Sequence, residues 1–187
     1  MSGLTNGLRG AAGAGALAAA GGGAAGLIDP IRTSHLSSAL QQAEPALLIP
    51  LTIAVTAVAA LLLRRAGRDS RTGRAGLVLT GAGAAGVVIA ASASLLTRKD
   101  HALGPVFGLG AILSVVGLIL IAITIAKSPV PPRWTGIALA VGWLIGGPLG
   151  PPATAFLLAA ILLAIAVTAR EPESAPPRHV PSASVPT

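Results

Sequence analysis

Two long apolar runs of this chain are separated by the stretch Arg64-Arg65-Ala66-Gly67-Arg68-Asp69-Ser70-Arg71-Thr72-Gly73-Arg74. The stretch holds five arginines and one aspartate, whereas the apolar runs on both sides of it contain no ionisable side chain. Short arginine-rich connections stay on the cytoplasmic side of a bilayer because their translocation is unfavourable. The stretch therefore predicts a cytoplasmic loop that contacts anionic headgroups, with these topology anchors: Arg64, Arg65, Arg68, Arg71 and Arg74.

The composition excludes a soluble domain. Of the 187 residues, 53% are hydrophobic and only 10% are charged, whereas soluble domains are about 25% charged. Several runs are long enough to cross a bilayer, for which about 20 apolar residues are needed. The sequence predicts an all-α, polytopic protein of the cell membrane.

The charge and the cysteine count exclude further classes. The net charge of +7 comes from basic residues in caps and short loops, and aromatic residues make up 2% of the chain, so no platform for stacking bases is present. We expect no nucleic-acid partner. The chain has no cysteine, which excludes disulfides, thiolate metal sites and a cysteine nucleophile.

Hydropathy divides the membrane domain, 1–169, into six expected spans at 10–28, 46–63, 75–96, 102–126, 134–145 and 153–169. The first span, Gly10 to Ile28, reaches about 28 Å, just enough to cross a hydrocarbon core. It is rich in glycine and alanine, so it also fits a signal sequence cleaved near Ala18 to Ala20. We favour a retained span because a signal core usually has a denser leucine run.

The first connection, Asp29 to Glu44, is expected to contain a short amphipathic helix after Pro30, capped by Thr33 or Ser34. Its apolar face would consist of Leu36, Ala39, Leu40 and Ala43. Pro45 would then open the second span. At the other end of the chain, 170–187 is rich in proline and lacks apolar periodicity, which predicts a disordered cytoplasmic tail.

The segment 134–169 is too long for a single span, because one helix would reach about 54 Å against a hydrocarbon core of about 30 Å. Glycines and prolines between Gly146 and Pro152 break it into two short spans joined by a turn. The first covers only about 18 Å, so we expect its turn to be recessed. The recess is a candidate solute site formed by Trp143, Gly147, Pro148 and Leu149.

Small residues predict where helices pack closely. In lipid the hydrophobic effect does not drive helices together, so close packing must stabilise their association. We expect the third span to be central, because side-chain bulk is nearly absent between Gly81 and Gly86. The predicted packing positions are Gly22, Gly26, Gly81, Gly83, Gly86, Gly104, Gly108, Gly142 and Gly146. Trp134, which follows a proline-rich connector, is expected to anchor its span at the membrane interface.

Ionisable side chains are absent from spans two to six as drawn. Proton-coupled carriers, intramembrane proteases and haem proteins typically keep such groups within their spans, so we expect neither a cofactor nor an enzyme. Some ionisable residues lie in the loops on the side of the membrane opposite to the arginine stretch, and their types suit a divalent metal. Their spacing follows no recognised metal site, however, so ordinary loop polarity explains them better. They are Asp29, His35, Glu44, Asp100 and His101.

Two functional hypotheses remain. The first is an accessory or assembly subunit that acts through helix contacts with another membrane protein or with a second copy, because small-residue faces are abundant and catalytic groups are absent. The alternative is a passive channel or permease for small neutral solutes, built around the broken hairpin.

The distribution of basic residues sets the orientation. With six spans, ten basic residues lie inside and only Arg32, Arg98 and Lys99 lie outside, whereas five spans would weaken the split to eight against five. The sequence therefore predicts six spans with both termini in the cytoplasm.

Single cysteines test this orientation in a chain that has none of its own. Cysteines at Ser70 and Ser182 should resist an impermeant thiol reagent applied to intact cells, and a cysteine at Ser38 should react, because only the last lies outside. Labelling at Ser182 would overturn the six-span model, and labelling at Ser70 would reverse the orientation.

Overall fold

The computed structural model describes residues 2–31, 35–67, 70–100 and 102–169. It confirms an all-helical architecture, since 83% of the described residues are helical and no strand is found among them. The helices are α1 (Ser2–Ile28), α2 (Ala39–Arg65), α3 (Arg71–Thr97), α4 (Gly104–Ala126), α5 (Arg133–Gly146) and α6 (Ala155–Thr168), with a 3-10 turn, η1 (Pro152–Thr154), before α6. The predicted tail at 170–187 lies outside the described residues.

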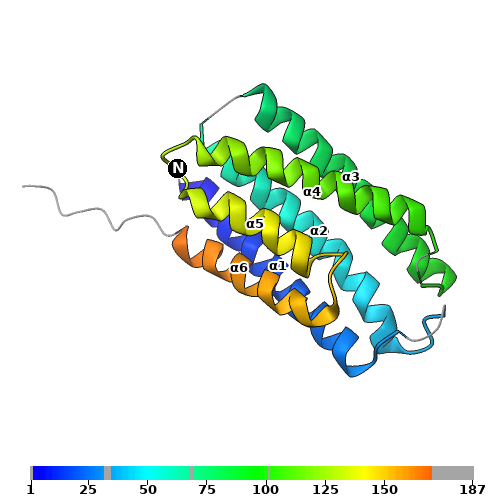
Figure 1. Ribbon diagram of the computed structural model, residues 1–187. Coiled ribbons are helices and arrows are strands. Elements are labelled where there is room, and N and C mark those ends of the chain that lie inside the picture. The colour runs from blue at the N-terminus through cyan, green and yellow to red at the C-terminus, as the bar shows by residue number, and fades with distance from the viewer. Residues whose placement is uncertain (1, 32–34, 68–69, 101, 170–187) are drawn as a thin grey trace, which may run out of the picture.

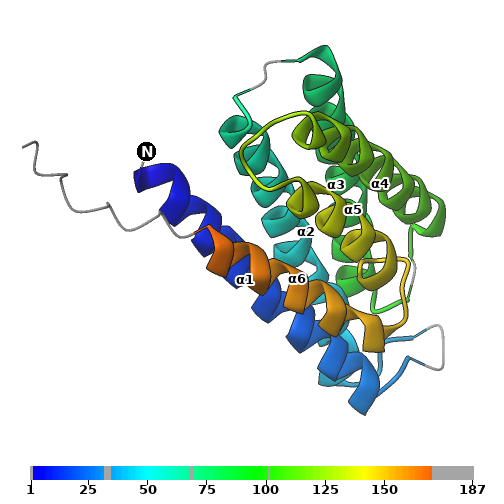
Figure 2. The ribbon, with the colours of Figure 1, turned by 60° about the vertical axis from the view of Figure 1, so that its left-hand side comes forward.

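The six helices form an antiparallel bundle in which each packs against the next and α6 closes against α1. Figure 1 places the start of α1, the α2–α3 connection and the end of α6 at one end, here called the arginine end. The α1–α2 and α3–α4 connections lie at the opposite end, here called the cavity end. Figure 2 shows α1 and α6 along one side of the bundle and α3 and α4 along the other.

The helices fall into two length classes. Four of them, α1 to α4, are 23 to 27 residues long and are apolar enough to cross a membrane. The other two, α5 and α6, have 14 residues each, or about 21 Å, less than a hydrocarbon core of about 30 Å. The predicted short hairpin is thus present, and its turn lies short of the cavity ends of α2 and α3 (Figure 1).

The start of α2 differs from the prediction. Among the described residues of the α1–α2 connection, 29–31 and 35–38, no separate helix is found. Helix α2 begins at Ala39, and its N-cap is Ser38, whose hydroxyl oxygen accepts a hydrogen bond from the amide of Gln41 at 3.0 Å. The expected caps Thr33 and Ser34 lie outside the described residues. Pro45 therefore lies inside a helix, as does Pro50. Prolines are tolerated in membrane helices where neighbouring helices compensate for the lost hydrogen bonds. The prediction that the helix begins at Pro45 was therefore wrong.

The arginine stretch is mostly helical. Arg64 and Arg65 form the last turn of α2, and α3 begins at Arg71 with Ser70 as its N-cap. Cations are favourable at a helix C-terminus and unfavourable at an N-terminus. Arg71 and Arg74 therefore oppose the dipole of α3, whose first turn contains no acidic residue. Helix α3 nevertheless begins directly after the Ser70 cap, so the predicted loop was too long.

The closest approach between two helices is that of α3 and α4. A Cβ on Gly83 would overlap the backbone of Gly110 and Ser114, and a Cβ on Gly117 would overlap the amide of Thr80. A Cβ on Gly76 would lie 2.8 Å from the carbonyl oxygen of Gly117. Only glycine lets the backbones come so close, so this seam holds α3 and α4 together by van der Waals contact.

The centre of the bundle is filled by large apolar side chains. A single cluster joins α1, α2, α4, α5 and α6, and its members that are at most 1% exposed include Leu8, Val58, Leu118, Ile121, Leu139, Trp143, Leu158 and Leu162. Helix α1 contributes residues between Leu8 and Ala19 to this core, and a Cβ on its Gly15 would lie 3.0 Å from both Ala54 and Leu162. Helix α1 is thus an integral part of the core, and its retention as a span stays a prediction.

Alanine substitutions two residues apart on α3 test the glycine seam. Gly83→Ala should destabilise the protein by about 1–3 kcal/mol because the new methyl group overpacks the contact with α4. Gly81→Ala should leave stability unchanged or raise it, because nothing lies within 4 Å of that Cβ position and alanine is the better helix former. The measurement is thermal unfolding in detergent. Equal midpoints for the two variants would contradict close packing at Gly83.

Candidate solute-binding cavity

The α5–α6 turn is compact because glycine occupies the positions where the chain folds back on itself. A Cβ on Gly147 would overlap the carbonyl of Trp143, and a Cβ on Gly150 would overlap that of Ile145. The amide of Gly147 donates to the Trp143 carbonyl oxygen at 3.0 Å, and the amide of Gly150 donates to that of Gly147 at 3.1 Å. The turn thus uses its own amides for carbonyls that the helix end leaves unpaired.

Thr154 stabilises the turn from its far side. Its hydroxyl lies 2.6 Å from the carbonyl oxygen of Ile145 and 2.7 Å from that of Pro151, and it can donate to one of them at a time. A carbonyl stranded in lipid costs several kcal/mol. A threonine of the hairpin itself therefore pairs with one of the carbonyls of the turn.

The turn docks on the cavity end of α1. A Cβ on Gly23 would lie 2.9 Å from the carbonyl oxygen of Pro152, and a Cβ on Gly26 would lie 2.8 Å from the Pro152 ring. The small residues of α1 therefore allow η1 to pack closely against this helix. Because α5 and α6 stop at this level while α2, α3 and α4 continue, the groove between the long helices is left uncovered beyond the turn.

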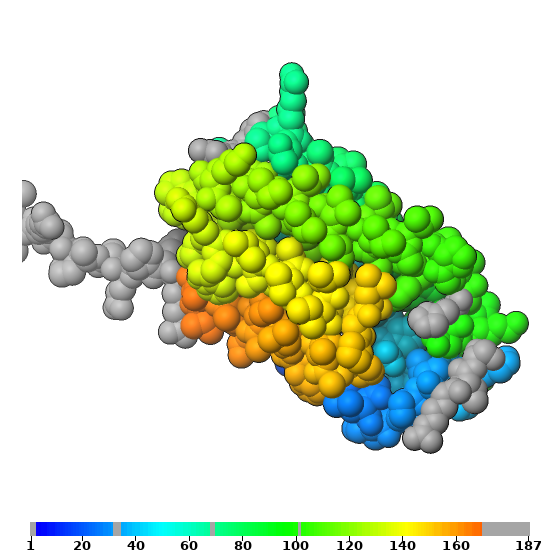
Figure 3. Space-filling model, viewed as in Figure 1, coloured from blue at the N-terminus to red at the C-terminus, as the bar shows by residue number. Residues whose placement is uncertain are grey.

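A cavity of about 120 Å³ occupies this uncovered groove. Figure 3 shows it as a hollow between the α5–α6 turn and α4, with α2 visible at its bottom. Most of its walls are apolar or glycine, contributed by α1, α2, α3, α4 and the turn. These wall residues include Ala18, Gly22, Leu48, Leu51, Ala91, Phe107, Pro148 and Pro152.

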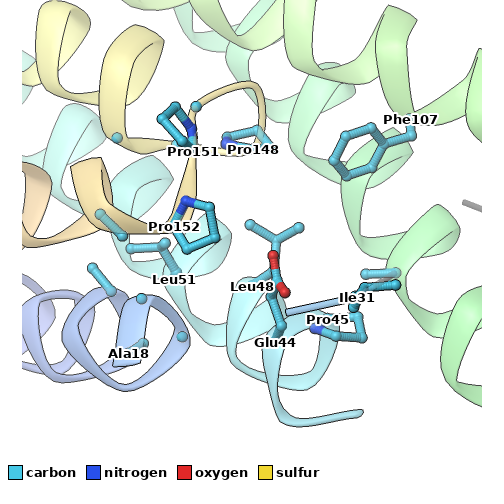
Figure 4. Close-up of a pocket in the computed structure, with 18 of the residues that line it drawn as sticks. Ala18, Ile31, Glu44, Pro45, Leu48, Leu51, Phe107, Pro148, Pro151 and Pro152 are labelled. Atoms are coloured by element: carbon cyan, nitrogen blue, oxygen red, sulfur yellow. The ribbon is translucent and has the colours of Figure 1, made fainter. Parts of the chain in front are cut away.

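Two acidic side chains line the cavity, and no basic residue is among its described lining residues. Glu44 is half-buried on α2, and one of its carboxylate oxygens, Oε2, lies 3.3 Å from the Cβ position of Gly26 on α1. Figure 4 shows Glu44 reaching into the space between the turn and Phe107 of α4. Asp100, also half-buried, comes from the α3–α4 connection.

Contacts between the two connections of the cavity end hold Asp100 in place. The amide of Leu36 donates to the carbonyl oxygen of Arg98 at 2.9 Å, and His35 pairs with Lys99 in an antiparallel bridge. Within the α3–α4 connection, the amide of Ala102 donates to the Ser94 hydroxyl at 3.4 Å. The α1–α2 and α3–α4 connections are thus joined by backbone hydrogen bonds.

The other polar residues of these loops have structural roles. Asp29 accepts hydrogen bonds from the Ser38 hydroxyl and, at 3.2 Å, from the side-chain amide of Gln41, so it fixes the start of α2. No group of three potential metal ligands occurs among the described residues, from which His101 is missing. The preference for ordinary loop polarity over a metal site therefore stays a prediction.

The predicted solute recess overlaps the cavity in part. Gly147 and Pro148 line it. Leu149 is half exposed and is not one of its lining residues, while Trp143 is 1% exposed and packs in the core. The aromatic residue that lines the cavity is Phe107. The prediction that Trp143 lines the recess was wrong. Phe107 was missed because nothing in the sequence aligns the first turn of α4 with the distant α5–α6 turn.

The predicted packing glycines divide into two groups. Six lie near a neighbouring helix or turn: Gly22, Gly26, Gly83, Gly86, Gly142 and Gly146. For Gly81, Gly104 and Gly108, no described heavy atom lies within 4 Å of the Cβ position. Close packing of these three within the chain is therefore a wrong expectation, because spacing alone does not show which face of a helix meets a neighbour.

The predicted topology anchors lie together at the arginine end. Arg64, Arg71 and Arg74 are exposed, and Arg65 donates to the Thr5 hydroxyl of α1 at 2.9 Å. Arg68 lies outside the described residues. Trp134, in the first turn of α5, is 41% exposed. Arg65 thus ties two helices together as well as carrying charge.

Comparison with family models, with curated protein sequences and with solved structures found no match. The fold and its apolar surface define the class, a polytopic, all-α integral membrane protein with four long helices and a short helical hairpin.

Proposed function

We propose that this chain is a non-enzymatic protein of the cell membrane that binds a small solute in the cavity at the cavity end of its bundle. The observation that carries the proposal is the position of the cavity, which is open beyond the short hairpin and is lined by all four long helices and by the two connections of the cavity end. Concave, mostly apolar sites with a few polar groups are the usual form of small-molecule sites.

Binding from one side fits the structure better than an open channel does. Below the cavity, the bundle is filled by side chains that are at most 1% exposed, among them Val55, Val58 and Leu62 of α2. An open channel would need a gap through this core. A permease remains compatible with the fold only if the helices rearrange, so binding is the activity proposed here.

The cavity lining supports a non-enzymatic role. Apart from Glu44, Asp100 and the Ser94 hydroxyl, its described lining residues are apolar or glycine, and they include neither histidine nor cysteine. A serine nucleophile needs an adjacent base, and Ser94 instead accepts the amide of Ala102. We place the arginine end in the cytoplasm and the cavity outside, as the distribution of basic residues favours.

Single cysteines on one face of α2 test whether the cavity is accessible. Leu48 lines the cavity, and Val55, seven residues further along α2, is 1% exposed in the core. In proteoliposomes, Leu48→Cys should react with neutral, polar 2-hydroxyethyl methanethiosulfonate at least about tenfold faster than Val55→Cys, because opening a packed core requires local unfolding. Equal, slow reaction at both positions would contradict an accessible cavity.

A second candidate function, assembly through helix contacts, rests on Gly104 and Gly108. They lie four residues apart on α4, and no described heavy atom occupies their Cβ positions. Neighbouring Leu109 is 64% exposed. Such a surface suits the close approach of a helix from a second copy.

Cross-linking tests this assembly. Leu109→Cys should form disulfide-linked dimers in oxidised membranes, and adding Gly108→Leu should reduce the dimer severalfold by blocking close approach. Adding Ile119→Leu, an exposed position further along α4, is the matched control. Equal dimer yields in the two double variants would exclude this interface.

A further inference from the structure

The polar side chains of the cavity lining are already used by the chain itself. Glu44 and Asp100 each have an interaction within the chain, and the Ser94 hydroxyl accepts a hydrogen bond from the amide of Ala102 at 3.4 Å. No basic residue is among the described lining residues. A charged solute would lose its hydration here without gaining a spare counter-charge, which is strongly unfavourable. The lining therefore favours an uncharged group.

The inner part of the cavity is apolar. Along α2, the lining residues change from Glu44 near the cavity end to Leu48 and then Leu51, about 10 Å further into the bundle. The innermost lining residues of α3, Ala90 and Ala91, are both 3% exposed. An apolar group at this depth is removed from water, and this burial stabilises its binding.

The outer part of the cavity lies at the polar end of the bundle. Asp100 belongs to the α3–α4 connection, and Glu44 lies in the second turn of α2. Figure 3 shows the hollow open to the outside beside the α5–α6 turn. A molecule that enters with an apolar end first therefore keeps its other end near water.

The volume of the cavity limits the length of the apolar group. An apolar cavity of about 150 Å³ admits one benzene molecule, which has six carbon atoms. A cavity of about 120 Å³ therefore holds about five carbon atoms. This is the size of a pentyl group or of the end of a longer alkyl chain.

From these observations, we infer that the cavity binds an alkyl chain end-first, with about five carbon atoms inside and no charge on the enclosed part. The end of the chain packs against Leu51, Ala90 and Ala91. This inference rests on the proposed solute binding and specifies the class of solute. Free amphiphiles and membrane phospholipids both offer such a chain, so the experiment has an arm for each source.

The experiment measures how straight-chain alcohols protect Leu48→Cys from the same neutral thiol reagent in phosphatidylglycerol vesicles. From propanol to pentanol, the half-protecting aqueous concentration should fall about fourfold with each CH₂, which corresponds to about 0.8 kcal/mol. From hexanol to octanol it should stay constant, because the additional carbons remain outside the cavity. Partitioning into lipid increases through the whole series and produces no such limit.

Charged analogues test whether the enclosed part must be uncharged. Pentylammonium and pentane-1-sulfonate carry the same chain as pentanol with a cationic or an anionic head. Each should need at least about a tenfold higher concentration for half protection, because a charge near the cavity finds no spare partner.

Larger wall residues test the volume. Ala91→Val on α3 and Ala18→Val on α1, each combined with Leu48→Cys, should raise the half-protecting concentration of pentanol about tenfold. That of propanol should hardly change, because its shorter chain still fits. Ala85→Val is the matched control, since Ala85 is exposed on α3 and does not line the cavity. Thermal unfolding midpoints near that of Leu48→Cys show that the variants are folded.

Digitonin micelles test the source of the chain, because digitonin is a steroid glycoside without a long alkyl chain. If phospholipid chains occupy the cavity, Leu48→Cys without added alcohol labels severalfold more slowly in vesicles than in digitonin. Equal rates identify a free amphiphile as the source.

The outcomes separate this inference from the proposed solute binding. No protection by any alcohol, a half-protecting concentration that keeps falling through octanol, or equal protection by pentylammonium would overturn the alkyl site while leaving solute binding intact. Labelling of Leu48→Cys no faster than that of Val55→Cys in either medium would overturn both.

Discussion

The reach of a helix, 1.5 Å per residue, is the constraint on which this structure depends. Helices α1 to α4 are long enough to cross a bilayer, whereas α5 and α6, with 14 residues each, are not. The hairpin must therefore turn before it reaches the cavity end. Everything that makes the cavity follows from this early turn: an uncovered groove between the long helices, a floor of core side chains, and walls that the turn itself completes.

Glycine makes the early turn possible and also holds the rest of the bundle together. At Gly147 and Gly150 the chain folds back where no Cβ could fit, and at Gly83 and Gly117 the backbones of α3 and α4 touch. In lipid, such contacts stabilise helix pairs that have no hydrophobic drive to associate. Much of the glycine content that suggested contact with other proteins is thus used inside the chain.

The sequence predicted the number of helices and the short hairpin, because length and apolar composition determine these features. It could not predict which glycines meet a neighbour, since Gly81 and Gly83 differ only in the face of α3 that they occupy. The helix boundaries near Pro45 and Arg71 were predicted wrongly because tertiary packing overrides local helix propensity. The cavity itself combines Glu44, Asp100 and Phe107 from three separate segments, and no spacing in one segment reveals such a meeting.

Thermal unfolding of the protein in nanodiscs, measured with a panel of small solutes, tests the central claim that the space beyond the short hairpin is a binding site. A solute that binds the folded protein raises the unfolding midpoint. We predict that such a shift is lost when Leu48→Trp fills the cavity and is retained when Ile53→Trp adds the same bulk at a position that is 58% exposed. A shift that survives Leu48→Trp unchanged would contradict the account.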